Sequence, residues 1–454
     1  ITVPQNTTAY IPVKNTDVRI ESHQKSLLDT DSNDLTHSNV DYAITVEDLV
    51  EYLLPIFSDE SIQKITHDAK FAILVLSHLN NGNCEFPNII DTQIASYLLG
   101  DFNISLDRLA QKKLDLELID SKSLLGSGKK MIQYQEVDIQ MLAQYASSRS
   151  LALSELSNNL LSDVEQNSLR TILDEIDLPH IAVLARIEQF GMALDRSVLS
   201  SLSVELREKI SLLESQAYKE IGHDFKIGSP QELSKVLFEE LNLPLTRKTK
   251  TGYTTDANAL TSMRHLHPLI DVILNWRELT KIKSTYVDSL PLQVDASTSR
   301  VHTIFSQSTT ATGRLSSNDP NLQNIPVRSD LGQAVRKAFV ARDCGANPIL
   351  LSIDYSQIEL RVLAHVSDDS ALRQAFINGE DIHSATAASI FRIDQKDVTS
   401  EMRRRAKVFN FGVLYGLTGF GLSQREGIEI EEANAFIEAY FNAYPKVQEW
   451  RESI

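Results

Sequence analysis

The chain has 454 residues, of which 42% are hydrophobic and 23% charged, an ordinary composition for a globular protein of about two to four domains. Its formal charge of -17 argues against an overall basic surface for nucleic acid, although screening over roughly 10 Å leaves room for a local basic cleft. With Cys84 and Cys344 as its only cysteines, neither a disulfide framework nor a zinc site is expected, which fits a reducing cytosol.

Both ends of the sequence predict a fragment of a longer protein. It begins without Met and stops inside a helix-like pattern, at Ile454. It contains neither a signal peptide nor an apolar run long enough for a membrane span, so we expect no membrane association.

The N-terminal residues 1–173 are predicted to form an α/β domain. Hydrophobic periodicity favours helices over 46–56 and 71–79. Strand-like runs occupy 8–13 and 88–90, and the second of them ends directly before Asp91.

Residues 174–297 are predicted to be mostly helical. Ser229 followed by Pro230 is typical of an N-cap with proline at the first helical position. The predicted helices span 174–190, 199–221 and 230–241.

A basic, hydroxyl-rich stretch follows at 246–255 and predicts an exposed loop. It contains Arg247, Lys248 and Lys250. Two interpretations stay open: a solvated run of charge, or a loop that contacts a phosphate backbone, since Lys, Arg and Thr suit phosphate oxygens.

From residue 300 the pattern favours short strands at 301–305 and 338–341, and then a buried apolar strand at 349–353 that ends in Asp354. A carboxylate at the carboxyl end of a strand is well placed to bind a divalent metal. The alternative is an N-cap Asp for the next helix. Glu359 could be a second metal ligand or a first-turn Glu favoured by the helix dipole.

Helices are predicted again over 369–454, and one of them carries an ordered series of side chains. Arg403, Lys407, Phe411 and Tyr415 lie four residues apart. Each step advances about 6 Å and drifts about 40°, so the four form one shallow stripe. Two cations followed by two aromatic rings suit a nucleotide lying lengthwise, with Arg and Lys on its phosphates. The alternative is an amphipathic helix with a basic outer face and an aromatic inner face.

Gly412 and Gly416 are poor helix formers, and they predict either the close approach of another group or a helix end. Phosphoryl transfer needs in-line positioning, divalent ions near the α-phosphate and cations on the leaving pyrophosphate. Asp354 could supply one anionic metal ligand, and Lys407 could stabilise or protonate the leaving group. These residues together predict a nucleotidyl-transfer site.

In this order, the motifs resemble those of the large fragment of bacterial family A DNA polymerases. Residues 354–361 are similar to the family's motif A and residues 403–416 to its motif B. Residues 312–317 and 320–328 are similar to its palm segment, and 381–383 to a fingers segment.

The resemblance implies the fold class and the domain order. The first domain would be an α/β, RNase H-like 3'-5' exonuclease-like domain, and the rest an α+β right hand. The implied parts are a degenerate exonuclease-like domain at 1–173, a connecting helix and thumb at 174–297, a partial palm at 298–366 and partial fingers at 367–454.

The resemblance also implies roles at the reacting nucleotide. Asp354 and the carbonyl of Tyr355 would bind magnesium, with two ions in the complete enzyme. Glu359 would be the steric gate against a ribose 2′-hydroxyl, packing near Tyr415. The implied nucleotide-binding residues are Gln357, Glu359, His383, Arg403, Lys407, Phe411 and Tyr415.

Contacts to DNA are implied as well. Arg314 would read the primer terminus from the minor groove, where acceptors shared by all correct pairs allow a check of shape rather than sequence. The basic stretch would be the thumb tip. The remaining implied DNA contacts are Asn321, Asn324, Arg328, Arg247, Lys248 and Lys250.

Two departures from the family pattern matter. In the exonuclease-like domain Ala72 and Arg149 stand where metal-binding Asp residues are expected, whereas Asp91 remains. The segment with the first exonuclease carboxylates would precede Ile1. Because one carboxylate cannot hold two metal ions, we expect no proofreading. The third polymerase motif, with the second catalytic carboxylate, would lie beyond Ile454. The isolated chain is therefore predicted not to polymerise.

The resemblance favours a template-directed DNA polymerase that takes dNTPs and a primer-template. It is expected to be a monomer that acts in replication and repair, cytoplasmic in a bacterium and associated with the nucleoid. One alternative is a relative that polymerises RNA, against which the gate at Glu359 argues. The other is a module that binds primer-template without chemistry.

Overall fold

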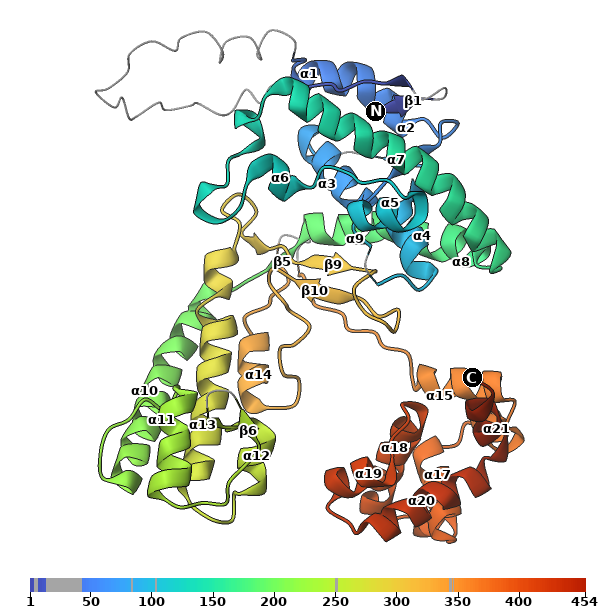
Figure 1. The fold of residues 1–454 in the computed structure, drawn as a ribbon. Helices are drawn as coiled ribbons and strands as arrows, with labels where there is room; N and C mark the ends of the chain where they lie inside the picture. Colours follow the sequence, from blue (N-terminus) through green and yellow to red (C-terminus); the bar gives the residue numbers. More distant parts are fainter. Residues whose placement is uncertain are drawn as a thin grey trace. The chain divides into compact units, whose positions relative to one another are not determined.

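The computed structural model describes residues 1–3, 7–13, 43–82, 85–102, 104–249, 252–342, 345 and 347–454. They form two compact units, Ile1–Leu350 and Leu351–Ile454. Each unit has hydrophobic clusters of its own, and each is described by itself (Figure 1).

The first part of unit 1 is built on a short parallel pair of strands, β3 (Lys64–Thr66) and β4 (Ile89–Asp91). Helices surround the pair, and the long α7 crosses this part of the unit in Figure 1. The predicted strand at 88–90 and helix at 71–79 are confirmed. The helical elements are α1 (Val46–Asp48), η1 (Leu49–Leu53), α2 (Leu54–Ser58), α3 (Ala69–Leu79), α4 (Thr92–Leu98), α5 (Leu106–Leu114), α6 (Ser121–Leu125), η2 (Gly128–Lys130), η3 (Tyr134–Glu136) and α7 (Ile139–Gln166).

At the start of the chain β1 (Thr2–Val3) and β2 (Thr7–Thr8) form a small antiparallel pair. The predicted strand at 8–13 is therefore only partly present, as the end of β2 and an isolated bridge at Val13. The helical core beneath is apolar, because α3, α4, α5 and α7 each turn one apolar face inward. Its fully buried members include Leu109, Leu156 and Leu160.

The middle of unit 1 contains two long helices, α10 (Arg196–Ile221) and α13 (Leu269–Ile282), that pack against each other. The predicted N-cap is confirmed, because the Ser229 hydroxyl accepts a hydrogen bond from the backbone N–H of Glu232 and Pro230 is the first helical residue. The other helical elements of this part are α8 (Arg170–Ile172), η4 (Leu173–Asp177), α9 (Leu178–Phe190), α11 (Pro230–Lys235), η5 (Val236–Glu240), α12 (Ala257–Ser262), η6 (Lys283–Val287) and η7 (Leu290–Gln293).

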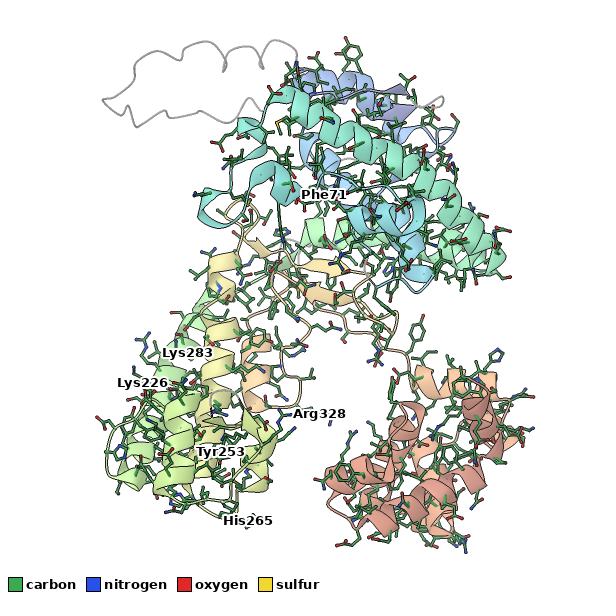
Figure 2. All side chains as sticks on the ribbon, viewed as in Figure 1. Phe71, Lys226, Tyr253, His265, Lys283 and Arg328 are labelled. Atoms are coloured by element: carbon green, nitrogen blue, oxygen red, sulfur yellow. The ribbon has the colours of Figure 1, made fainter. Side chains whose placement is uncertain are left out.

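The basic stretch at 246–255 is not the unpatterned loop that was predicted. β6 (Lys248–Thr249) and β7 (Gly252–Tyr253) pair as a two-stranded ribbon. The ribbon is anchored because the Tyr253 ring packs edge-on against Phe238, 5.5 Å away between centroids. In Figure 2, Tyr253 lies among the helices of this part of the unit. An aromatic anchor at one end accounts for the regular structure that composition alone did not indicate.

The last part of unit 1 contains two small antiparallel pairs and one helix. β5 (Met192–Ala193) pairs with β8 (Arg300–Val301), and β9 (Ile304–Ser306) pairs with β10 (Ser316–Asn318). The predicted strand at 301–305 is thus split between β8 and β9. The predicted strand at 338–341 is reduced to one bridge from Phe339 to Leu194. It follows α14 (Asp330–Arg336), the helix of this region.

Unit 2 is helical, as predicted for residues 369–454. α17 packs against both α18 and α20. The core that they enclose includes Leu360, Phe409 and Tyr440. The elements are α15 (Ile358–Ser367), α16 (Ser370–Ile377), α17 (Ile382–Phe391), η8 (Gln395–Asp397), α18 (Ser400–Leu414), α19 (Gly419–Glu426), α20 (Ile430–Ala443) and α21 (Pro445–Ser453).

The prediction of a buried strand at 349–353 is wrong. The segment has no regular structure, and Ile349 and Ile353 are 79% and 83% exposed. A strand is stable only when a neighbouring strand satisfies its backbone and a packed layer covers its apolar face. Among the described residues no strand pairs with this segment. The apolar run at 349–353 is present in the sequence, but it does not indicate whether another strand is available to pair with it.

Candidate functional site

The first three residues of the predicted stripe lie on α18 of unit 2, and Tyr415 directly follows Leu414, the last residue of that helix. Arg403, Lys407 and Tyr415 are exposed, and Phe411 is half-buried. Between them Phe409 and Asn410 point into the core, so α18 has one buried and one accessible side. The amphipathic alternative was thus partly right, because Phe411 packs against the core of unit 2, whereas Tyr415 is exposed.

The two glycines of this segment behave as predicted. A Cβ on Gly412 would lie 2.4 Å from the Leu417 side chain, so only glycine allows the chain after α18 to fold back so closely. Gly416 has a φ of 71° and lies just beyond the end of the helix at Leu414.

Arg403 has a carboxylate partner that the sequence did not indicate. Its Nε donates to Asp381 Oδ2 at 2.5 Å and its terminal nitrogen donates to Oδ1 at 3.2 Å. Burial raises the pKa of Asp381, but hydrogen bonds from Arg403 and Ser384 outweigh it and hold that pKa below its ordinary value. Asp381 also caps α17 by accepting from the backbone N–H of His383. Asp381, in the segment 381–383, thus contacts Arg403, the first residue of the stripe.

His383 is buried beside the stripe rather than displayed on the surface. Its ring lies 5.8 Å from the Phe411 ring, and its Nδ1 lies 3.0 Å from Asn410 Nδ2. Burial lowers the pKa of His383; Asp381 opposes this effect, and Arg403 and Lys407 reinforce it. The imidazole is consequently neutral at pH 7.

Asp354 and Tyr355 lie in the exposed segment before α15, and Tyr355 is 79% exposed. Neither residue is at the end of a strand, which corrects the predicted setting of the carboxylate. Gln357 occupies the N-cap position of α15 with a left-handed φ of 53° and makes no side-chain cap.

Glu359, in the first turn of α15, meets the end of the stripe. The Tyr415 hydroxyl donates to Glu359 Oε1 at 2.6 Å. This bond joins the helix that follows Asp354 to the C-terminal end of α18. The predicted proximity of Glu359 and Tyr415 is therefore present, and the interpretation of Glu359 as only a dipole-favoured residue is insufficient.

The donor set for a metal ion is incomplete in the part of the chain that the structure describes. Within it no group of three or more His, Cys, Asp or Glu side chains gathers to hold an ion. Asp354 and a carbonyl of Tyr355 supply two oxygen donors, whereas magnesium prefers six. The residues present do not by themselves fit a magnesium centre.

In unit 1, the segment around Arg314 is held by the exonuclease-like part. The Tyr97 hydroxyl of α4 donates to the carbonyl of Thr310 at 2.5 Å and accepts from the backbone N–H of Gly313 at 3.1 Å. Thr310 in turn donates to the carbonyl of Arg314 at 2.6 Å. The sequence carried no signal for this contact, since 213 residues separate Tyr97 from Thr310.

The other predicted DNA contacts of unit 1 are accessible to differing degrees. Asn321 is half-buried and accepts from the backbone N–H of Asn324 at 3.1 Å, which makes a local turn. Arg328 is exposed in the loop before α14 (Figure 2). Arg247 and Lys248 are exposed at the ribbon, and Lys250 lies outside the described residues.

In the exonuclease-like part, a neutral side chain at position 72 and a cationic side chain at position 149 stand where carboxylates were expected. Arg149 forms an ion pair with Asp107 and lies over the Tyr145 ring at 4.9 Å. Asp91 is only 2% exposed, and its oxygens accept from backbone N–H groups, including that of Ala69 at 2.7 Å. Burial raises the pKa of Asp91 to about 6. Asp91 therefore acts as a buried helix cap.

No helix in the described ranges combines the length and the apolar character needed to cross a bilayer.

Comparison with known families assigns the chain to a class. The family profile described as DNA polymerase family A matches residues 196–454, and that described as 3'-5' exonuclease matches residues 21–165. The first match covers more than half of the chain. The chain therefore belongs to DNA polymerase family A, and it carries an exonuclease-type domain before the polymerase region.

Individual relatives support the assignment to DNA polymerase family A. The chain is similar to DNA polymerase I of Pseudomonas aeruginosa, with 39% identity over 405 residues, 88% of this chain and 44% of the relative. It is also similar to the thermostable DNA polymerase I of Thermus thermophilus, with 49% identity over 310 residues, 68% of this chain and 37% of the relative. The chain thus spans less than half the length of these curated relatives.

A solved structure is similar over most of the chain. It is described as the POL domain of Pol1 from M. smegmatis in complex with DNA primer-template and dNTP. The similarity has a TM-score of 0.76 with 35% identity and covers 91% of this chain and 68% of that one. The fold of an exonuclease domain with a family A polymerase domain is therefore confirmed.

Proposed function

We propose that this chain belongs to a template-directed DNA polymerase that transfers deoxynucleotides from dNTPs to a primer 3′-hydroxyl. The observation that carries the proposal is the accessible stripe on α18, within a chain of family A. The proposal includes action as a monomer in replication or repair, in the cytoplasm of a bacterium at its nucleoid.

The phosphates of the dNTP would be bound at the start of the stripe. Arg403 already holds two carboxylate oxygens of Asp381 in a fork, the geometry in which guanidinium groups also bind phosphate. An incoming triphosphate would compete with Asp381 for this fork. Lys407, one turn further along, would add a point charge, and His383 a hydrogen bond.

The sugar and base would lie at the aromatic end. Phe411 would contact the sugar, and Tyr415 would flank the base. Glu359, tied to Tyr415 by their hydrogen bond, would exclude a ribose 2′-hydroxyl. Gln357, at the start of the same helix, would lie near the triphosphate. A fixed carboxylate resists displacement better than a mobile one, so the bond supports the gate and disfavours the RNA-polymerising alternative.

Primer-template DNA would be bound by unit 1. The M. smegmatis relative is described as a complex with primer-template and dNTP, which supports the same ligands here. Arg314 would contact the primer terminus and Arg328 the template-primer, together with Asn321 and Asn324. The ribbon residues Arg247 and Lys248, with Lys250, would contact backbone phosphates without sequence preference.

Family A polymerases generally use divalent metal ions, and we propose magnesium. This chain would contribute Asp354 and the carbonyl of Tyr355 as ligands. Bound magnesium would neutralise charge on the phosphates and activate the primer hydroxyl. Because these two donors fall short of a magnesium centre, we assign no reaction step to them.

The exonuclease-like domain would be structural and would not proofread. Three observations support this role: Ala72 and Arg149 stand at expected carboxylate positions, and Asp91 is a buried cap. The domain also braces the rest of unit 1. Lys70 of α3 forms an ion pair with Glu188, whose carboxylate accepts from the backbone N–H of Phe305 at 2.6 Å.

A primer-template binding module without chemistry is the second candidate. The incomplete metal donor set among the described residues favours it for the chain taken alone. A longer polypeptide, of the length of the curated relatives, distinguishes the two candidates. A polymerase would extend a primer, whereas a binding module would bind primer-template without extending it.

Primer extension tests the proposal. We expect the present chain to bind primer-template and to add no nucleotide with magnesium, and the longer polypeptide to extend the primer. Asp354→Asn in the longer polypeptide should abolish extension and preserve DNA binding. Asp368→Asn is the matched control, because Asp368 is an exposed carboxylate of unit 2 that forms an ion pair with surface Arg373. Full extension by Asp354→Asn, or none by the longer wild type, would contradict the proposal.

A further inference from the structure

Four buried polar side chains form a continuous line through the core of unit 2. Tyr444 OH lies 3.1 Å from Thr386 Oγ1, Thr386 Oγ1 lies 3.1 Å from Asn410 Oδ1, and Asn410 Nδ2 lies 3.0 Å from His383 Nδ1. All four residues are at most 3% exposed. They come from α17, α18 and the junction of α20 with α21 and end beside the stripe.

The chemistry of these groups gives the line a direction. An amide oxygen only accepts, so Thr386 donates to Asn410 and Tyr444 must donate to Thr386. An amide nitrogen only donates, so Nδ1 of His383 must accept. A neutral imidazole whose Nδ1 accepts carries its proton on Nε2. The line therefore selects one tautomer.

The remaining ring nitrogen is available for a ligand. Nε2 of His383 has no hydrogen-bond partner among the described residues, and it is not one of the fully enclosed polar atoms that lack a partner. It thus keeps contact with solvent. The charged groups that act on the ring are Asp381 at the start of α17 and Arg403 and Lys407 on α18. The two cations disfavour a protonated ring, and burial lowers the pKa further.

We propose that Asn410, Thr386 and Tyr444 are positioning residues that hold His383 as the neutral Nε2–H tautomer, ready to donate one hydrogen bond to a phosphate oxygen of the nucleotide. His383 donates this bond and transfers no proton. The tautomer follows from the hydrogen bonds alone, whereas the phosphate acceptor rests on the proposed function. Holding the ring in one tautomer and rotamer before the ligand arrives lowers the cost of ordering it on binding.

The first experiment reads the tautomer without any nucleotide. The chain is labelled with 15N-histidine, and the His383 signals are assigned by their loss in His383→Gln. We expect Nδ1 to give a pyridine-type signal and Nε2 a pyrrole-type signal at neutral pH. Asn410→Asp puts an acceptor in place of the donor and should move the proton to Nδ1. Asn442→Asp, at an exposed position of α20, should change nothing. A pyrrole-type Nδ1 in the wild type would overturn the proposal.

The second experiment uses the longer polymerase and measures KM for a dNTP. Loss of one hydrogen bond in the line, in Tyr444→Phe or Thr386→Val, should raise KM by up to about tenfold with little change in kcat. In a His383→Gln background the same substitutions should have no further effect, because they act through His383. Additive effects would overturn the positioning role. A wild type that binds no dNTP would instead refute the proposed function and leave the NMR result intact.

Discussion

Arg403 is not free to meet a nucleotide, because Asp381 already occupies its guanidinium group. The pair is partly exposed, with 47% and 34% of the two side chains accessible, so water screens it and it is worth at most about 1 kcal/mol. A triphosphate, with more charge, can displace such a partner. The carboxylate therefore competes with the triphosphate for Arg403, at a small energetic cost to binding.

Asp381→Asn tests this competition. Asparagine keeps the N-cap of α17 but removes the charge, so dNTP binding should tighten by about two- to fivefold at low salt. The measurement is a fluorescence titration of the longer polymerase with dNTP at two ionic strengths. Asp368→Asn breaks the exposed pair with Arg373 in the same unit and should leave the affinity unchanged. Weaker binding by Asp381→Asn would mean that the carboxylate orients Arg403 rather than competes for it.

The buried carboxyl of Asp91 should leave a pH signature on stability. Burial raises its pKa from 3.8 to about 6, so the folded state holds this proton more tightly than the unfolded chain does. The contribution of Asp91 to the free energy of unfolding is therefore fully present below pH 3.8 and is lost as the pH rises through 6. The full loss is about 3 kcal/mol, from about two pKa units.

Asp91→Asn removes this titration. From pH 4 to pH 7 the wild type should lose about 3 kcal/mol of unfolding free energy relative to Asp91→Asn. Urea unfolding of both proteins at several pH values measures that difference, whatever constant cost the substitution adds. A difference that stays flat, or that grows in favour of the wild type, would show that Asp91 is ionised without penalty.

Among elements, the contact of α4 with the segment before Arg314 connects the exonuclease-like part to a segment that we propose binds DNA. The Tyr97 hydroxyl holds two backbone groups of that segment, at Thr310 and Gly313. A loop held at two points loses less conformational freedom when DNA binds. The exonuclease-like part would thus contribute to the proposed primer binding through a structural contact.

Tyr97→Phe should therefore weaken primer-template binding by about two- to tenfold, since it removes the hydroxyl and preserves the ring. Fluorescence anisotropy of labelled primer-template with the 454-residue chain gives the affinity. Tyr52→Phe, at an exposed tyrosine of η1, is the control and should bind as the wild type does. Equal affinities for the two variants would refute a role for this contact.

Local patterns in the sequence predicted the elements that local interactions stabilise. The spacing of Arg403, Lys407, Phe411 and Tyr415 predicted an accessible stripe, because helical geometry alone puts them on one side. The Ser229 cap was predictable for the same reason.

Contacts between distant segments could not be predicted in this way. The strand expected at 349–353 failed because strand pairing depends on a partner elsewhere in the chain. Asp381, Tyr97 and the line from Tyr444 to His383 were missed likewise, since their partners lie 22 to 213 residues away. The resemblance supplied roles for the site residues, but it did not indicate these supporting contacts.

For the whole molecule, the division into two units predicts two separate unfolding events. The core around Leu237 lies wholly in unit 1, and the core around Phe409 lies wholly in unit 2. A chain whose cores share no members need not unfold in one cooperative step. The two tryptophans, Trp276 and Trp450, lie one in each unit and pack against these two cores.

Single-tryptophan variants can follow each event. Trp450→Phe leaves Trp276 to report on unit 1, and Trp276→Phe leaves Trp450 to report on unit 2. Phe409→Ala should lower the stability reported by Trp450 by about 3 to 5 kcal/mol and leave the signal of Trp276 unchanged. Leu237→Ala should do the reverse, by about 2 to 5 kcal/mol. Urea unfolding followed by fluorescence gives both midpoints. If each core variant moved both midpoints together, the two units would unfold as one and would be energetically coupled.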